Sequence, residues 1–129
     1  MSQTFEAIFK NLDAKLKNVR ALNLTTADGF PLYSYINGSF KIEEDKLSAV
    51  TSSLTALSHA AARQIMNDDY ESTCIETSMG MMFMVQTRYQ DQDCILSLIS
   101  YGQPNLGQIR YYLLRLAKYL TTAKLSAEK

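Results

Sequence analysis

The sequence predicts an α/β protein of the α+β sandwich type, with a five-stranded antiparallel sheet between one long helix and two terminal helices. The predicted order of elements is α-β-β-α-β-β-β-α. Three observations support this fold. Apolar residues recur at steps of three and four in three segments, which is the period of amphipathic helices. Residues 81–85 and 94–99 are almost continuously apolar, as strands covered on both faces are. The pair Asp28-Gly29 separates two strand-like segments and is a strong hairpin signal.

The chain opens with a helix and a hairpin. Residues 3–17 carry an apolar stripe that predicts an amphipathic helix: Phe5, Ile8, Phe9, Leu12 and Leu16. Residues 19–26 and 30–36 are the predicted hairpin strands. We expect a type I′ turn between them, because the Asp and the Gly both tolerate a positive φ. Pro31 has no amide hydrogen, so the second strand should lie at an edge of the sheet.

The long helix is predicted to begin after Glu43, to run to Ile65 and to end near residues 67–69. Its larger apolar residues share one stripe: Leu47, Val50, Leu54, Leu57, Ala61 and Ile65. Small residues run roughly opposite: Ala49, Ser52, Ser53, Ala56 and Ala60. We expect the apolar stripe to cover the sheet and the small stripe to remain free for a second contact. The helix therefore predicts assembly with another molecule rather than chemistry.

The second half of the chain predicts three strands and a last helix. The strands are expected over residues 71–77, 81–87 and 94–100. The first is the most polar, which suits an edge of the sheet, and the other two belong in its centre. Pro104 suits the first turn of a helix. The apolar stripe of that helix follows: Leu106, Ile109, Leu113, Leu116, Ala117 and Leu120. The first and last helices should share one face of the sheet.

Size and charge limit the function. The 129 residues are expected to form a single domain over residues 1–125, followed by a frayed tail at 126–129. Lys plus Arg equals Asp plus Glu, at 13 each, so the basic excess typical of nucleic-acid binding is missing. No apolar run is long enough to predict membrane insertion. Because no secretion leader is recognisable, we expect a cytoplasmic protein.

The two cysteines, Cys74 and Cys94, lie in predicted strands. We expect two buried free thiols rather than a disulfide, because both strands should neighbour the fourth strand of the chain. Second-neighbour strands lie about 9.6 Å apart, which exceeds the usual Cα separation of a disulfide.

No motif predicts catalysis, a metal site or a cofactor site. His59 is the one histidine, and zinc needs three or four ligands at recognisable spacing. The sequence has no phosphate-binding loop, dinucleotide fingerprint or nucleophile elbow. The loop carboxylates are expected to be solvated: Asp68, Asp69, Asp91 and Asp93. Met79, Met81, Met82 and Met84 suggest either core filling or a soft-metal site or adaptable binding surface. We expect the alternating methionines of the strand to fill the core, and the alternative rests on Met79 and its neighbours at an exposed turn.

Three local motifs, in this order and spacing, resemble the Roadblock/dynein light-chain domain family. They are the hairpin Leu24-Thr-Thr-Ala-Asp-Gly-Phe-Pro-Leu32, the Ala- and Ser-rich helix from Glu43 to Ile65, and Asn105-Leu-Gly-Gln-Ile-Arg110 at the start of the last helix. The resemblance implies a non-catalytic protein that dimerises, with the middle helices side by side and the sheets joined through the third strand. Such proteins serve dynein complexes or small Ras-like GTPases as scaffolds, exchange platforms or GTPase-activating partners. The bacterial polarity regulators among them supply no arginine finger.

We therefore expect a homodimer that binds a small GTPase. The expected dimer interface comprises Ala49, Ser52, Ser53, Ala56, Ala60, Thr73 and Ile75. The candidate partner-binding residues are His59 and Arg63 on the long helix, with Tyr111 and Tyr112 on the opposite face as the alternative. A second hypothesis is a small-ligand sensor with a pocket between sheet and helix. It would need convergent polar residues in the core, whereas the central strands are almost wholly apolar apart from Ser97.

Overall fold

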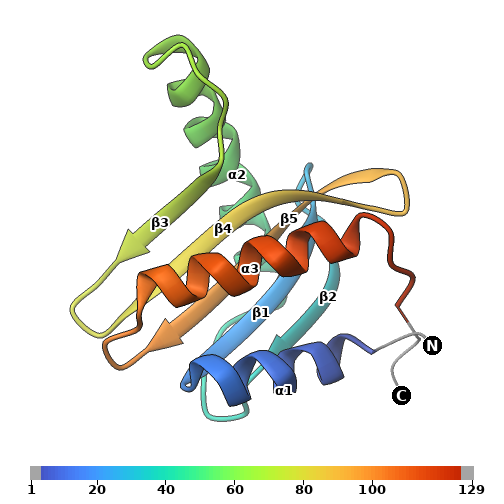
Figure 1. The fold of residues 1–129 in the computed structure, drawn as a ribbon, viewed down its shortest axis with the longest axis vertical. Coiled ribbons are helices and arrows are strands. Elements are labelled where there is room, and N and C mark those ends of the chain that lie inside the picture. The colour runs from blue at the N-terminus through green and yellow to red at the C-terminus, as the bar shows by residue number, and fades with distance from the viewer. Residues whose placement is uncertain (1–3, 126–129) are drawn as a thin grey trace.

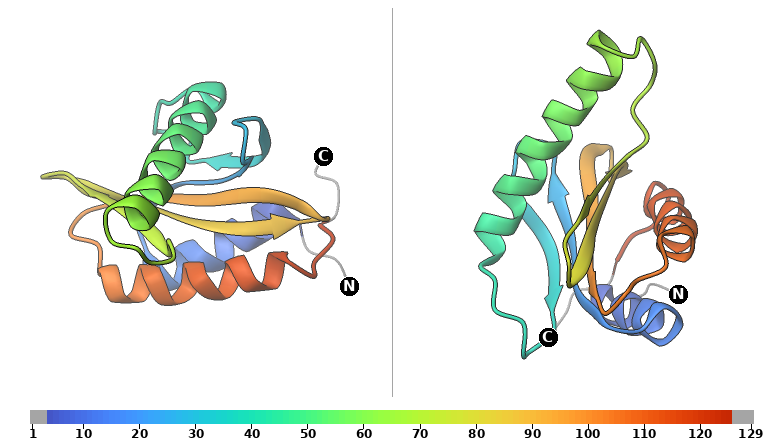
Figure 2. Two further views of the ribbon diagram at one scale, coloured as in Figure 1. Left: turned by 90° about the horizontal axis from the view of Figure 1, so that it is seen from above. Right: turned by 90° about the vertical axis from the view of Figure 1, so that its left-hand side faces the viewer.

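The structure, a computed structural model, describes residues 4–125 and has a five-stranded antiparallel sheet with helices on both faces (Figures 1 and 2). The elements are α1 (Phe5–Leu16), β1 (Val19–Thr26), β2 (Pro31–Ile36), α2 (Glu44–Gln64), β3 (Ser72–Glu76), β4 (Gly80–Tyr89), β5 (Gln92–Tyr101) and α3 (Leu106–Leu120). The strand order is β2-β1-β5-β4-β3. The predicted fold class and element order are confirmed, and β2 and β3 are the edge strands, as expected. The predicted tail, 126–129, lies outside the described residues.

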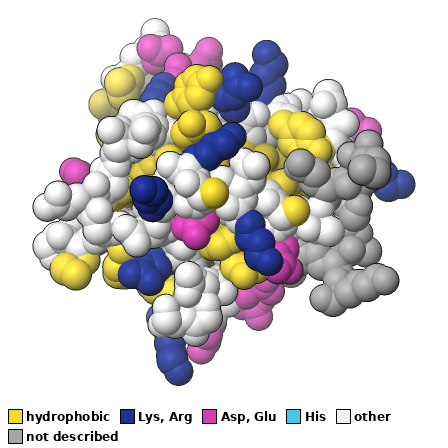
Figure 3. All heavy atoms as spheres, turned by 60° about the horizontal axis from the view of Figure 1, so that its bottom comes forward, with side chains coloured by type: hydrophobic (Ala, Val, Ile, Leu, Met, Phe, Trp, Pro, Cys, Tyr) yellow, Lys and Arg dark blue, Asp and Glu magenta, His cyan; other side chains and the backbone are white. Residues whose placement is uncertain are grey.

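The main core fills the space between the sheet and the layer formed by α1 and α3. Its largest fully buried side chains come from α1, the three central strands and α3: Phe5, Phe83, Leu22, Leu24, Leu96, Leu98, Ile109, Leu113 and Leu120. Phe5 and Phe9 of α1 stack on Tyr33 and Tyr35 of β2, with ring centroids 5.6 and 4.1 Å apart. On the outer surface of this layer, hydrophobic side chains are interspersed with Lys and Arg (Figure 3).

The predicted type I′ turn occurs in a different hairpin. Gln90 and Asp91, between β4 and β5, both have positive φ, 49° and 64°. These two residues form the whole turn. The predicted strands, 81–87 and 94–100, left a longer connection over residues 88–93. At the first hairpin only Gly29 has a positive φ, and its N–H donates to the Thr26 carbonyl at 2.9 Å. This is the pattern of a three-residue loop in which a turn is followed by a left-handed glycine.

Helix α2 does not cover the sheet with its apolar stripe, so that prediction was wrong. Its buried residues are mostly small and polar: Leu47, Ser48, Thr51, Thr55 and Ala62. The stripe residues Val50, Leu57 and Ile65 are instead 44%, 69% and 81% exposed. The reason lies in the sheet, because β1 presents the polar side chains of Asn23 and Thr25 to α2. Hydroxyl-bearing residues can satisfy those groups, and leucines cannot.

The cysteines are both free thiols, as expected, and β4 separates their strands. Cys94 on β5 is buried. Cys74 on β3 is exposed, so the expectation that it would be buried was wrong. It lies on an edge strand, whose outer side no other strand covers.

Candidate functional site

Polar side chains fix the first half of α2 on the sheet. Asn23 Nδ2 donates to Ser34 Oγ at 2.7 Å and to Ser48 Oγ at 3.4 Å. Thr25 Oγ1 hydrogen-bonds to Ser48 Oγ at 2.7 Å and also to Asn23 Oδ1. All but Ser34 are buried. Because hydrogen bonds are directional, this network sets the rotation of α2 and decides which sides of the helix stay exposed.

Sequence reasoning missed this polar network, although a signal for it was present. Along β1, Ala21, Asn23 and Thr25 alternate with Leu22 and Leu24. Such a period of two indicates a strand with one apolar and one polar face. The leucines enter the main core, and the polar face lies under α2.

The middle of α2 and the segment after it also lie over polar groups. The hydroxyls of Thr51 and Ser97 are buried and have no hydrogen-bond partner among residues 4–125. Tyr70 follows the helix, and its hydroxyl lies 2.5 Å from Thr73 Oγ1 on β3. Burial raises the pKa of Tyr70, and the hydrogen bond to Thr73 partly opposes that shift.

One flank of α2 carries the exposed apolar stripe, defined here as Val50, Leu54, Leu57, Ala61 and Ile65. Beside its first turns lies a largely apolar groove of about 830 Å³, lined by Phe40, Ile42, Leu47, Val50, Met82 and Ile99 among others. Met82 pairs with Ile75 of β3, so this groove opens toward the β3 edge. The right-hand view of Figure 2 faces that edge, with α2 on one side of the sheet and α1 and α3 on the other. Stripe and strand edge therefore lie on the same side of the molecule.

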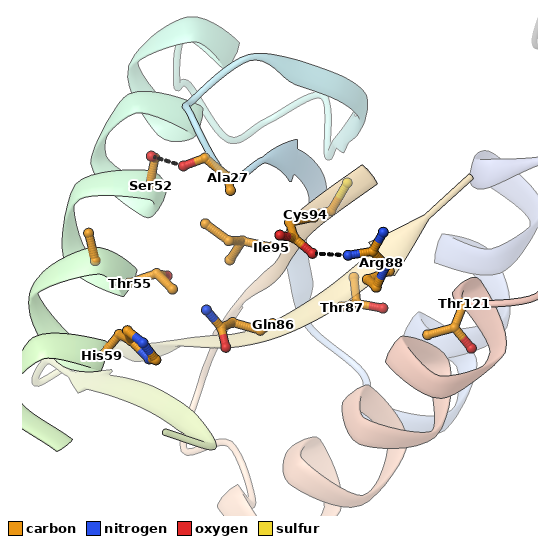
Figure 4. A pocket seen from close by; sticks show the side chains of 12 residues that line it. Ala27, Ser52, Thr55, His59, Gln86, Thr87, Arg88, Cys94, Ile95 and Thr121 are labelled. Carbon is orange, nitrogen blue, oxygen red and sulfur yellow. Dashed lines mark hydrogen bonds and ion pairs between the residues drawn. The ribbon is translucent and has the colours of Figure 1, made fainter. Parts of the chain in front are cut away.

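The other flank of α2 borders a second groove, of about 470 Å³, between the helix and the β4–β5 hairpin (Figure 4). We call it the hairpin groove. Its lining includes Ser52, Thr55, Ala56 and His59 from α2, Gln86, Arg88, Asp93, Cys94 and Ile95 from the hairpin, and Ala27 from the β1–β2 turn. Helical spacing of 3.6 residues per turn places Ser52, Ala56 and His59 roughly opposite the apolar stripe. A molecule covering the stripe would thus leave this groove open.

Interactions within the molecule hold the polar side chains around the hairpin groove. Ser52 Oγ donates to the Ala27 carbonyl at 2.6 Å, which ties α2 to the first hairpin. Arg88 Nη1 lies 2.5 Å from Asp93 Oδ1 across the strand pair. The exposed His59 ring meets the edge of the Tyr70 ring, with centroids 6.3 Å apart.

The candidate partner-binding residues fall on two separate faces. Arg63 lies one helical turn after His59 on the same flank of α2, and its Nη1 is 2.7 Å from Asp69 Oδ1. Tyr111 and Tyr112 lie on α3, across the sheet, where their rings meet edge to face at 5.1 Å. The structure therefore brings His59 and Arg63 together and separates them from the two tyrosines.

The expected dimer residues are also divided. Ser52 and Ala56 line the hairpin groove, and Ala49, Ser53 and Ala60 complete the small stripe. Thr73 and Ile75 are half-buried on β3. Sequence reasoning did not single out Gln86 or Arg88, and it took Asp93 for a solvated loop carboxylate, since these residues approach α2 only in the folded chain.

The family follows from the match of the sequence to the model of the Roadblock/LC7 domain, which extends over residues 5–89. The chain belongs to the Roadblock/LC7 domain family. The matched segment spans α1 to β4, and so includes the whole of α2 and both of its flanks. The resemblance seen in the hairpin and the central helix is thereby confirmed.

Several solved structures share the fold of this Roadblock/LC7 protein. A Roadblock/LC7 domain from Streptomyces avermitilis matches with a TM-score of 0.75 at 15% identity, over 91% of this chain and 94% of that one. The gliding protein MglB from Thermus thermophilus matches with a TM-score of 0.74 at 14% identity, covering 90% and 84%. MglB from Myxococcus xanthus matches with a TM-score of 0.69 at 18% identity, covering 84% and 85%. No curated protein matches the sequence.

The side chains offer little for catalysis or metal binding. Within residues 4–125, no group of three or more His, Cys, Asp or Glu side chains is placed to hold a metal ion. None of the helices in that range combines the length and apolar character needed to cross a membrane. The expectation that the protein has no enzymatic activity and no cofactor stays a prediction.

Proposed function

We propose that this Roadblock/LC7 protein is a homodimeric regulator or scaffold that binds a small Ras-like GTPase and has no catalytic activity of its own. The observation that carries the proposal is the division of α2 into two flanks. One flank is apolar and adjoins a free strand edge, and the other borders a polar groove. Two such flanks suit two different contacts, one with a second copy and one with a partner.

The apolar stripe supports a dimer interface that differs from the one expected from sequence. Large apolar side chains exposed together on one flank indicate a surface that another molecule covers. Among residues 4–125, strand β3 pairs only with β4, so within that part of the chain its outer edge is free to pair with a second β3. A two-fold axis near this edge would bring two stripes and two β3 strands together at once. We therefore assign the interface to the stripe, with Thr73 and Ile75 of β3, rather than to the small residues around Ala56.

The hairpin groove supports a separate docking surface for the GTPase. His59 lines it, Arg63 lies one helical turn further along the same flank of α2, and Gln86 and the Arg88–Asp93 pair reach it from the hairpin. Because this flank faces away from the stripe, dimerisation leaves it accessible. Its mixture of charged, amide and small side chains is typical of a polar interface that forms and dissociates.

The test is binding to small GTPases from the organism that encodes the protein, each loaded with GDP or with a non-hydrolysable GTP analogue. Ala56→Gln adds bulk within the groove and should weaken binding about tenfold or more. Arg63→Glu should slow association and make it more dependent on salt. Arg115→Glu makes the same charge change on the opposite face and is the matched control. If no GTPase binds the wild type in either nucleotide state, the proposal is wrong.

The polar network under α2 favours a second candidate, a small-ligand sensor. The hairpin groove has the size of many small-molecule sites. Buried hydroxyls lie beside α2, contrary to the apolar interior that the sequence suggested. Native mass spectrometry of protein purified from its own host tests this function, because a bound small molecule should appear as a defined mass that Ala56→Gln removes.

A further inference from the structure

The face formed by α1 and α3 has a concentration of positive charge, although the whole chain has none in excess. Residues 106–120 contain Arg110, Arg115 and Lys118 and no acidic residue. Between α1 and α3 runs a groove of about 770 Å³, which we call the terminal-helix groove. The charged side chains in its lining are all cationic: Lys15, Arg115 and Lys118.

These three cations form no ion pair within residues 4–125, unlike others on the same face. Lys10 pairs with Glu6 at 3.0 Å, and Arg110 pairs with Glu71. Lys15 Nζ lies over the ring of Tyr112, 5.2 Å from its centroid. Arg115 lies over Tyr111, with its Cζ 5.4 Å from the centroid. Aromatic faces orient these charges without neutralising them, so they remain available to an external anion.

The floor of the terminal-helix groove is apolar. Ile8 and Leu12 from α1 and Leu116 from α3 line it, all of them buried or nearly so, and Tyr112 and Tyr119 stand at its wall. An occupant that uses the whole groove needs apolar side chains for the floor and negative charges for the rim. A small inorganic anion would satisfy the rim alone.

We propose that the terminal-helix groove binds an acidic peptide segment of a partner protein, with one or two apolar side chains seated between α1 and α3. We infer an acidic segment because Lys15, Arg115 and Lys118 are all cationic and would attract negative charge. A membrane-binding face must project its apolar groups into the bilayer. The apolar floor of this groove is concave, so it fits a protruding peptide better than a flat bilayer. Most of this groove lies across the sheet from the hairpin groove (Figure 2), and the two grooves meet at Thr121, just after α3, which lines both.

The experiment selects ligands from a displayed library of random peptides as long as α3, 15 residues. Selection on the full-length wild type, with Arg115→Glu as counter-selection, should enrich peptides rich in Asp and Glu that carry apolar anchors. In fluorescence anisotropy these peptides should bind Arg115→Glu about tenfold more weakly than wild type, and their affinity should fall as salt rises. Arg63→Glu, the same change on the α2 face, should bind them as wild type does. Equal unfolding midpoints of the variants show that the fold is intact.

Two results would overturn the proposal. One is a selection with no acidic enrichment, or selected peptides that bind Arg115→Glu as tightly as wild type. The other is that no peptide is selected and that the protein instead floats with phosphatidylserine vesicles but not with phosphatidylcholine vesicles. This flotation would have to be lost in Arg115→Glu. That outcome would make the groove part of a membrane-binding surface.

Discussion

Two neighbouring residues of α2 distinguish the dimer interface that we propose from the one expected from sequence. Leu57 belongs to the apolar stripe, and Ala56 lies about 100° away around the helix, on the hairpin groove. We expect Leu57→Gln to dissociate the homodimer and Ala56→Gln to leave it intact. Glutamine and leucine have similar helix propensities, so the exposed substitution should barely change the stability of the monomer.

The magnitude follows from the exposure of Leu57. Full burial of a leucine side chain stabilises by about 3 kcal/mol. In the monomer 69% of Leu57 remains exposed, so a partner that covers it contributes about 2 kcal/mol per copy. A two-fold interface counts this residue twice, which gives about 4 kcal/mol and a dimer Kd about a thousandfold weaker in Leu57→Gln.

Sedimentation equilibrium of wild type and both variants over a range of concentrations measures these constants. A wild type that stays monomeric at high micromolar concentration would rule out the homodimer. Dissociation by Ala56→Gln with Leu57→Gln unaffected would return the interface to the small stripe and show our assignment of the two flanks to be wrong. If neither variant changes the Kd of a dimeric wild type, the two copies meet elsewhere.

Further predictions concern stability and the thiols. Asn23→Ala should lower the free energy of unfolding by about 3 kcal/mol in urea titration, because it removes three hydrogen bonds, to Ser34, Ser48 and Thr25, at about 1 kcal/mol each. Gly80→Ala should lower it by about 2 kcal/mol, since the added Cβ would lie 2.5 Å from the Ser100 carbonyl oxygen; a stability equal to wild type would contradict that clash. In native protein a maleimide should modify the exposed Cys74 but not the buried Cys94. Partial desolvation and the nearby Glu76 carboxylate raise the pKa of the Cys74 thiol, so its thiolate is scarce at neutral pH and modification should accelerate as pH rises. If two β3 strands pair in the dimer, a short bismaleimide should join the Cys74 thiols of two copies, and Cys74→Ser should abolish the product.

Element order and strand centrality were predictable from sequence, because each depends on the apolar pattern within one segment. The face shared by α1 and α3 was also predicted, from the expected arrangement of one helix on one side of the sheet and two on the other. The hairpin turns were less predictable. Asp28 and Gly29 formed the better type I′ signal, yet that turn occurs at Gln90 and Asp91. The register of β1 with β2 shifts between Leu24 and Thr25, where Leu32 of β2 is skipped, and this shift lengthens the first hairpin loop by one residue. The straight pairing of β4 with β5 leaves two residues for the second turn, whatever their preference.

The orientation of α2 shows why the site was harder to predict than the fold. An apolar stripe indicates that something covers that side of a helix, but not whether the cover is the helix's own sheet or another molecule. For α2 the decision rests on Asn23 and Thr25, some two dozen residues earlier, whose hydrogen bonds to Ser48 turn the hydroxyl-bearing side of the helix toward the sheet. The stripe is then left outside, beside the free edge of β3. In this protein a polar pairing inside the chain thus determines which apolar surface of α2 stays exposed.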